Sequence, residues 1–246
     1  MNFIVGALLL LNSLSAYSTA LLVGSITGST PFADMSTAGN GVYFYGFSID
    51  IMNDICKRLA MECIYSQTKI GDQLLALEQQ TVDVVLLASP CGTIQLQPYA
   101  LSLPYLTSHV SFIAMNNSPL KKGDPIKNLK IGVMKSTFYE LLKNSPYQEY
   151  NQIIPFNSVP DLISGVLIHE VDVVVINSDI ARYFVSNDLY KIKPIAEDVP
   201  LGEGYGIVAL KKNVALINKI NGAILDMQKD GTYLKIYNHY QPPVTK

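Results

Sequence analysis

The sequence has no tryptophan, three cysteines in 246 residues and only 15% charged residues. Its formal net charge is −2, and no basic stripe or acidic tail stands out. Because nucleic-acid-binding domains carry a basic patch, we expect no nucleic-acid partner. The three histidines, His109, His169 and His239, are scattered, whereas a zinc site needs about three or four converging ligands. We therefore expect no metal and no other cofactor.

Familiar catalytic and phosphate-binding motifs are also missing. The chain has no GxSxG elbow, no HExxH pair and no Walker loop. The segment Gly202-Glu203-Gly204-Tyr205-Gly206 only superficially resembles a phosphate loop, because it precedes an expected strand instead of following one. A flexible chain crossing between two lobes fits this segment better. We predict no catalytic residue and a protein that is not an enzyme.

The N-terminal residues favour export. Residues 3–11 form an apolar run, and the small residues Ala16, Ser18 and Ala20 after it fit the cleavage rule of a secretory signal peptide. The alternatives are a buried apolar helix or a membrane anchor, but an anchor needs roughly 20 apolar residues, more than this run has. We predict a signal peptide over residues 1–20 and a mature protein in the periplasm.

Cys56 and Cys63 are seven positions apart. Export would place them in an oxidising compartment, where a disulfide persists. Cys56 is expected near the end of a helix and Cys63 at the start of the next strand. Closing a loop of about eight residues there would contribute roughly 2.5 kcal/mol in the chain-entropy model. The alternative is two ordinary buried thiols, and Cys91 is left over as a small buried residue.

A strand–helix–strand–helix–strand pattern occurs twice. Runs such as Val171-Asp-Val-Val-Val-Ile-Asn-Ser178 are typical of strands buried on both faces of a parallel sheet. The expected strands cover 21–24, 82–89, 130–133 and 171–178, and the expected helices cover 48–60, 72–80, 138–144 and 161–170. The pattern predicts an α/β fold of two lobes, each a mainly parallel sheet flanked by helices.

The chain is expected to cross between the lobes twice. An extended apolar run at 111–115 leaves the first unit, and a strand at 205–210 and a long helix at 214–229 follow the second. If the last helices return to the first lobe, a cleft remains at the carboxyl ends of the parallel strands. We assign residues 21–112 and 205–246 to lobe 1, 116–202 to lobe 2, and hinge strands near 111–116 and 203–208.

An ordered series of short segments resembles one known family along the whole mature chain. The matching segments are Gly46-Phe47-Ser48-Ile49-Asp50, Cys56-Lys57-Arg58 with Cys63, residues 73–89, Leu103-Pro104-Tyr105, residues 130–137, and Asp230-Gly231-Thr232-Tyr233 with Tyr237. They are similar to segments of the periplasmic polar-amino-acid-binding proteins of ABC importers, solute-binding protein family 3, which bind lysine, arginine, ornithine, histidine or glutamine. The resemblance implies a disulfide between the two cysteines, distant from the ligand.

The same resemblance implies a type II, Venus-flytrap receptor. A small solute, an amino acid or a related compound, would bind between the lobes and favour their closure. The closed form would then dock on the membrane permease of an ABC importer, and we expect the receptor to be a monomer. The matching positions predict the following ligand contacts: Ile26, Ser29, Ile70, Leu87, Ala88, Gln95, Thr137, Phe138 and Asn177.

The departures from the family pattern concern charge. Gln95 stands where the family has the Arg that clamps the ligand carboxylate by a bidentate pair, and Asn177 replaces the Asp that pairs with the α-ammonium group. Ser29 and Ile70 stand at the positions of the aromatic sandwich. Ile26 occupies the position of an Asp that helps to hold basic side chains.

These losses predict a less charged or more apolar solute than a free basic amino acid. A zwitterion buried without charged partners would cost several kcal/mol. Backbone N–H groups at a helix beginning near Thr137 are one remaining carboxylate site. Arg182 and Lys135 are the second-lobe cations that could replace the missing Arg, and Phe138 and Leu87 are expected as apolar walls.

Two other functions compete with transport. One is a ligand-degenerate envelope protein that binds or signals to a partner. The other is a dehydratase-like enzyme on the same fold, which would need a buried general acid and cationic anchors. Glu203, Glu140 and Asp179 are possible acids, but the first lobe lacks the anchors.

Overall fold

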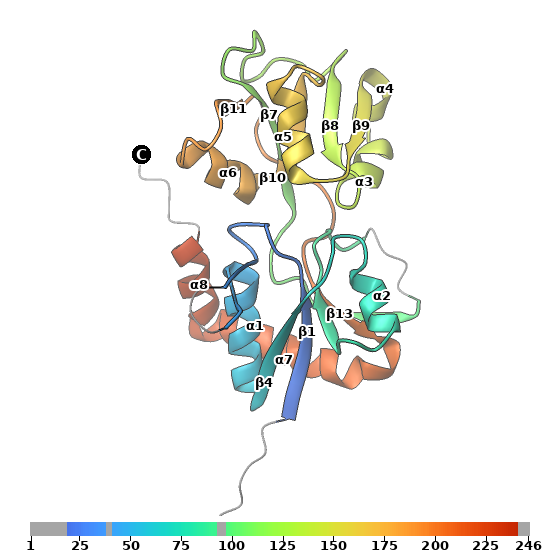
Figure 1. Ribbon diagram of the computed structural model, residues 1–246, viewed down its shortest axis with the longest axis vertical. Helices are drawn as coiled ribbons and strands as arrows, with labels where there is room; N and C mark the ends of the chain where they lie inside the picture. The colour runs from blue at the N-terminus through green and yellow to red at the C-terminus, as the bar shows by residue number, and fades with distance from the viewer. Residues whose placement is uncertain (1–18, 38–40, 93–96, 241–246) are drawn as a thin grey trace, which may run out of the picture.

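The computed structural model describes residues 19–37, 41–92 and 97–240, which form two lobes stacked along the long axis of the molecule (Figure 1). Each lobe is built on one β-sheet. In lobe 1 the strand order is β4-β1-β5-β13-β6, and in lobe 2 it is β9-β8-β10-β7-β11, with β12 pairing with β7. The lobe 1 strands are β1 (Thr19–Ser25), β4 (Met61–Gln67), β5 (Val84–Leu86), β6 (Tyr99–Leu101) and β13 (Ile207–Leu210).

The lobe 2 strands are β7 (His109–Met115), β8 (Lys130–Met134), β9 (Gln152–Phe156), β10 (Val173–Asn177), β11 (Ile192–Pro194) and β12 (Val199–Pro200). A small hairpin of β2 (Asp34–Ser36) and β3 (Tyr43–Tyr45) belongs to lobe 1. The helices are α1 (Phe47–Arg58), α2 (Gln73–Glu78), α3 (Tyr139–Lys143), α4 (Tyr147–Tyr150), α5 (Val159–Leu167), α6 (Ser178–Ser186), α7 (Val214–Asp230) and α8 (Thr232–Tyr240), with a 3-10 turn at Lys211–Asn213. No helix in the described part of the chain is both long and apolar enough to cross a membrane.

The two sheets share one plan, as the repeated sequence pattern predicts. In lobe 1, β4, β1 and β5 are parallel, and in lobe 2, β9, β8 and β10 are parallel. The next strand in each sheet arrives from the other lobe and pairs antiparallel, β13 with β5 and β7 with β10. The predicted two-lobe α/β fold is confirmed. Each sheet is parallel except on the side where the strand from the other lobe pairs antiparallel.

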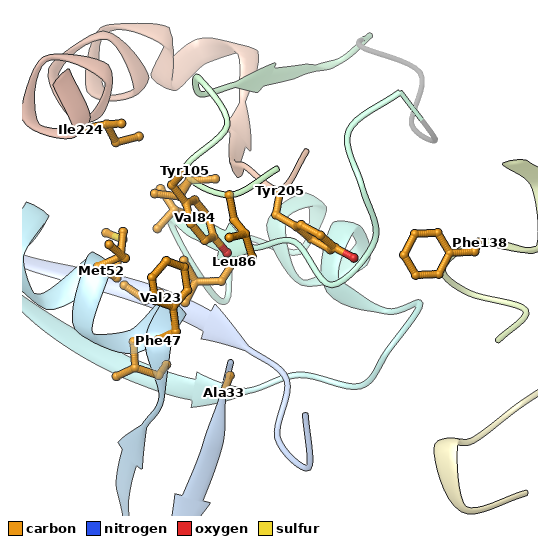
Figure 2. Packing of buried hydrophobic residues seen from close by; sticks show 14 of the residues in the cluster. Val23, Ala33, Phe47, Met52, Val84, Leu86, Tyr105, Phe138, Tyr205 and Ile224 are labelled. Carbon is orange, nitrogen blue, oxygen red and sulfur yellow. The ribbon is translucent and has the colours of Figure 1, made fainter. Parts of the chain in front are cut away.

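The central strands β5 and β10 are buried along their whole length, which explains their aliphatic sequences. The lobe 1 core forms where β1, β5, α1 and α7 meet, and Figure 2 shows Val23, Val84, Met52 and Ile224 converging there. Fully burying such side chains stabilises the fold by about 1.5–3 kcal/mol each. The last two helices return to lobe 1, where Tyr233 of α8 packs edge-on against Phe47.

The chain crosses between the lobes through two paired segments, 102–108 and 201–206. The Tyr205 N–H donates to the Leu106 carbonyl at 2.7 Å, and the Leu201 N–H donates to the Ser108 carbonyl at 3.1 Å. The first hinge prediction, 111–116, is therefore displaced. Its residues lie in or beside β7, which is bonded to β10, so lobe 1 ends before His109 and not at residue 112.

The glycine-rich segment 202–206 lies in the second of these paired segments. Gly204 has a φ of +103°, and a Cβ there would lie 2.6 Å from the Leu106 carbonyl oxygen. Only glycine permits both this backbone conformation and this approach of the two crossing segments. The crossing is hydrogen-bonded to its neighbour and does not form a phosphate loop.

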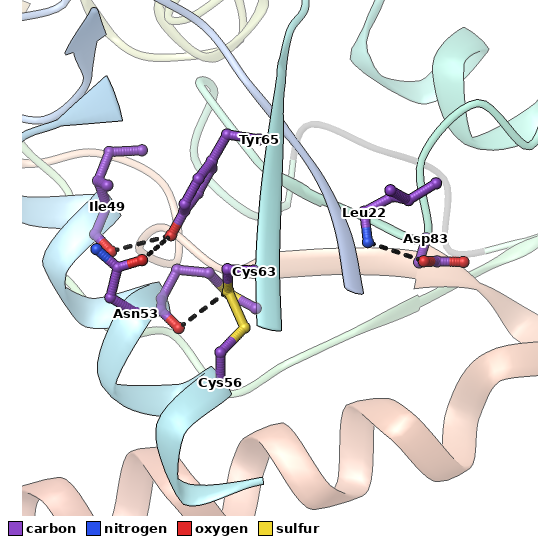
Figure 3. Close-up of a disulfide and its surroundings, with 8 residues drawn as sticks. Leu22, Ile49, Asn53, Cys56, Cys63, Tyr65 and Asp83 are labelled. Carbon is purple, nitrogen blue, oxygen red and sulfur yellow. Dashed lines mark hydrogen bonds between the residues drawn. A yellow bond between two sulfur atoms is a disulfide. The ribbon is translucent and has the colours of Figure 1, made fainter. Parts of the chain in front are cut away.

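Cys56 and Cys63 form a disulfide, with their Cα atoms 5.9 Å apart (Figure 3). It joins the end of α1 to β4, as predicted. Strand β1 begins at Thr19, so two of the twenty residues assigned to the signal peptide pair with β4. The rest of that predicted segment, residues 1–18, lies outside the described residues.

Candidate functional site

A cavity of about 60 Å³ lies between the two lobes. Lobe 1 contributes the loop after β1 and the end of β5, and lobe 2 contributes the ends of β8 and β10 and the start of α6. Seven of the predicted contacts line it: Ile26, Ser29, Ile70, Ala88, Thr137, Phe138 and Asn177. Leu87 lines an adjoining cavity of about 30 Å³ in lobe 1. The ninth predicted contact, Gln95, lies outside the described residues.

Asn177 ends β10 and caps α6. Its side-chain oxygen accepts from the Asp179 N–H at 2.8 Å and from the Ile180 N–H at 3.3 Å. These are the bonds that an N-cap asparagine makes. Its side-chain nitrogen donates to the Tyr205 hydroxyl at 3.1 Å. We expected the Asn177 amide to bind the solute, but its side-chain oxygen and nitrogen both already have hydrogen-bond partners within the protein.

Tyr205 is a cavity residue that sequence reasoning did not include. It lies on the second crossing, stacks on Phe32 with ring centroids 6.2 Å apart, and points toward Phe138 of lobe 2 (Figure 2). Burial of its phenol raises the pKa of Tyr205 above the usual value. The only sequence signal was an aromatic residue between the glycines of a crossing segment.

A buried glutamine shapes the lobe 1 rim. Gln73, at the start of α2, donates to the Leu86 carbonyl and accepts from the Ala88 N–H at 3.0 Å. It therefore fixes the backbone that follows β5. Nothing in the sequence distinguished this glutamine from a helix-surface residue.

The lobe 2 rim differs from the expected helix terminus. Thr137 lies in a turn, where its N–H and hydroxyl both donate to the Met134 carbonyl. Helix α3 begins only at Tyr139 and has five residues, with Phe138 at its N-cap position. The expected carboxylate site at a helix beginning near Thr137 is therefore weakened, because the Thr137 N–H is occupied and the helix is very short.

No charged side chain lines this cavity among the described residues. Arg182 does not supply the missing cation, because its guanidinium pairs with Asp179 and, at 2.7 Å, with Asp198. Burial raises the pKa of Asp179, and the Arg182 guanidinium opposes that shift. Lys135 is exposed and is not a lining residue. The two proposed substitutes for the clamp therefore do not reach the cavity.

Within the described ranges, no group of three or more His, Cys, Asp or Glu side chains could hold a metal ion. The cavity thus offers aromatic and aliphatic walls with hydroxyl groups from Ser29, Thr137 and Tyr205. Such a lining favours uncharged or weakly polar groups, because it provides no opposite charge to offset the cost of removing an ion from water.

Comparisons with known proteins agree on one family. The model of the bacterial extracellular solute-binding proteins, family 3, matches residues 21–243. The chain is 26% identical over 199 residues to the arginine-binding periplasmic protein of Mannheimia haemolytica, covering 79% of this chain and 81% of that protein. It is also 26% identical over 225 residues to the L-cystine-binding protein TcyJ of Escherichia coli K12, covering 91% and 82%.

A solved structure is similar along the whole fold. The arginine 3rd transport system periplasmic binding protein from Legionella pneumophila is 31% identical and superposes with a TM-score of 0.81. The match covers 91% of this chain and 100% of that one.

Proposed function

Because the chain belongs to the bacterial extracellular solute-binding proteins, family 3, we propose that it is the periplasmic receptor of an ABC importer. It would carry a small amino-acid-like solute without a basic side chain to a membrane permease, and it would catalyse no reaction. The relatives named for arginine and cystine support an amino-acid-like ligand.

One observation carries the choice of solute, namely the lining without charged side chains in the described part of the cleft. A guanidinium or ammonium group buried there would lose its hydration without gaining a carboxylate partner. Ile26 and Ile70 occupy two sides of the space instead. The lining therefore favours an aliphatic or amide side chain on the solute.

The small cavity volume supports a receptor that rearranges on binding. The space of about 60 Å³ is much too small for a whole amino acid. Pockets for drug-sized ligands begin at roughly 300 Å³. The side chains of Phe138 from lobe 2 and Tyr205 from the crossing segment fill much of the space between the two lobes (Figure 2). A solute would enter when the crossing segments rotate and separate these two rings, and the binding energy would then favour closure around it.

The test is calorimetry on the purified protein with arginine, lysine, glutamine and leucine, together with mass spectrometry of small molecules released by denaturation. We expect an uncharged-side-chain solute to bind and arginine and lysine to give no heat at micromolar concentrations. Ala88→Leu should abolish the binding by filling the cavity, whereas Leu75→Ala on the exposed face of α2 should leave it unchanged. Micromolar binding of arginine or lysine would overturn the proposal.

The small cavity also favours a second candidate, a ligand-degenerate envelope protein that binds a partner and no solute. This candidate requires that no small molecule is released from the protein and that no solute in the panel binds. A single solute whose affinity is lost in Ala88→Leu would exclude it.

A further inference from the structure

A second and larger cavity opens between the lobes, outside the solute cleft. Its volume is about 240 Å³. Lobe 1 contributes the β2–β3 hairpin and the end of α8, and lobe 2 contributes α6. None of its lining residues belongs to the cleft cavity described above. In Figure 1, α6 lies above α8 on the same side of the molecule, and each of these two helices contributes residues to the cavity lining.

The cavity contains one carboxylate that no cation neutralises among the described residues. Asp34 accepts from the Gly28 N–H at 3.1 Å, from the Met35 N–H at 2.8 Å and from the Thr30 hydroxyl at 3.0 Å. All three donors are uncharged, and they fix the carboxylate in place. Its negative charge raises the pKa of the phenol of Tyr45, which lines the same cavity.

Three tyrosines line the same cavity as this carboxylate. Tyr45 ends the hairpin, Tyr183 comes from α6, and Tyr240 ends α8. The Tyr240 hydroxyl donates to Asp50 at 2.7 Å, which holds that ring in position. The imidazole of His239 meets the Tyr240 ring edge-on, with centroids 4.8 Å apart. Tyrosine rings around a cation with a carboxylate nearby are the arrangement by which proteins bind organic ammonium ions.

We propose that this cavity binds a small organic ammonium ion, held by the Asp34 carboxylate and the rings of Tyr45, Tyr183 and Tyr240. The negative charge supplies the attraction, and the rings replace water around the alkyl groups. The cavity volume is slightly below that of pockets for drug-sized ligands, roughly 300 Å³, and so suits an ion of a few carbon atoms.

The site joins the two lobes through a single lobe 2 ring. Tyr183 is the lobe 2 aromatic residue in the cavity, whereas the carboxylate and the other two tyrosines belong to lobe 1. An ion bound against both lobes interacts with Tyr183 only while the lobes are close together. Its binding therefore favours the closed arrangement through residues that do not line the solute cleft.

The experiment is a calorimetric titration of the full chain with tetramethylammonium and choline chloride, with sodium chloride at the same ionic strength as the blank. Neohexanol, the uncharged carbon analogue of choline, measures the contribution of the positive charge. We expect the two ammonium ions to bind and neohexanol to bind at least about tenfold more weakly, because only a cation is attracted by the Asp34 carboxylate and by the faces of the tyrosine rings.

Variants locate the site. Asp34→Asn keeps the side-chain shape and should weaken tetramethylammonium binding by about tenfold. Tyr183→Leu should weaken it several-fold, and Tyr183→Phe, which keeps the ring, should bind within about twofold of the wild type. Leu75→Ala on the exposed face of α2 should leave ammonium binding unchanged, and failure of the solute panel to bind would not by itself remove the ammonium binding.

Three results would overturn the inference: no ammonium binding up to millimolar concentration, equal binding of neohexanol, or wild-type affinity in Asp34→Asn. Circular dichroism and the thermal midpoint of each variant identify a folding defect. If Asp34→Asn is unfolded, the comparison between Tyr183→Leu and Tyr183→Phe decides the question, because both changes lie at a partly exposed position of α6.

Discussion

The hydrogen bond between Asn177 and Tyr205 links lobe 2 to the chain crossing, and its energetic contribution can be measured. Asn177 is 3% exposed and Tyr205 is 8% exposed, so neither group has ready access to water. Changing Asn177 to Ala removes this bond and the cap of α6 together. Changing Tyr205 to Phe removes this bond and the hydroxyl's interaction with Ser108, leaves the cap of α6 intact and keeps the ring that stacks on Phe32.

The magnitudes follow from the two roles of Asn177. Loss of an N-cap costs about 1 kcal/mol, and loss of a buried neutral hydrogen bond costs about 1 kcal/mol. Asn177→Ala should therefore lower the free energy of unfolding by about 2 kcal/mol and Tyr205→Phe by about 1 kcal/mol. The double variant loses the shared bond only once, so it should lose about 2 kcal/mol and give a coupling energy of about 1 kcal/mol.

The assay is urea denaturation followed by tyrosine fluorescence, with the four proteins compared as a double-mutant cycle. Asn177→Ser is the matched control, because serine caps a helix well but is too short to keep the bond to Tyr205. It should lose only about 1 kcal/mol. Additive effects, with a coupling energy below about 0.3 kcal/mol, would refute the idea that this bond ties lobe 2 to the crossing.

Two further outcomes follow from lobe 1. Replacing both Cys56 and Cys63 with Ser should lower the free energy of unfolding by roughly 2.5 kcal/mol. The urea midpoint of the wild type should fall in the same way when a reductant is added. An unchanged midpoint in the double variant and in the reduced wild type would contradict this. The Thr232 backbone and side chain, and then Arg58, lower the pKa of Asp230 to about 2. Asp230 therefore contributes stability above its unfolded pKa, and that stability is lost as pH falls toward 2. The difference in urea midpoint between wild type and Asp230→Asn should shrink from pH 5 to pH 2, and a constant difference would count against the shift.

The sequence predicted the fold well because its signals are local and repeated. Aliphatic runs such as Val173–Asn177 can be buried on both faces only in the middle of a sheet, and the same strand–helix alternation occurs twice. The first hinge was misplaced because an apolar run such as 111–115 suits a crossing and a sheet strand equally well. Only its pairing with β10 shows that it belongs to lobe 2.

The candidate site was predicted in part. Residue matches located seven of the fourteen residues that line the cleft cavity, and their role in solute binding stays a prediction. The hydrogen bond from Asn177 to Tyr205 and the ion pair of Arg182 with Asp198 could not be predicted. Both interactions join residues that are distant in the sequence, and their geometry depends on the position of α6. Tyr205 and Gln73 were missed for the same reason.

The sequence by itself determined two α/β lobes and a disulfide between α1 and β4, because each depends on local pattern or residue identity, whereas the loss of charge at the family's clamp positions stays a prediction. Tertiary structure alone decided which polar groups remain available in the cleft and which side chains fill it. It also brought Asp34 together with tyrosines from the hairpin, α6 and α8. Such contacts depend on how the two lobes pack, which no local stretch of sequence encodes.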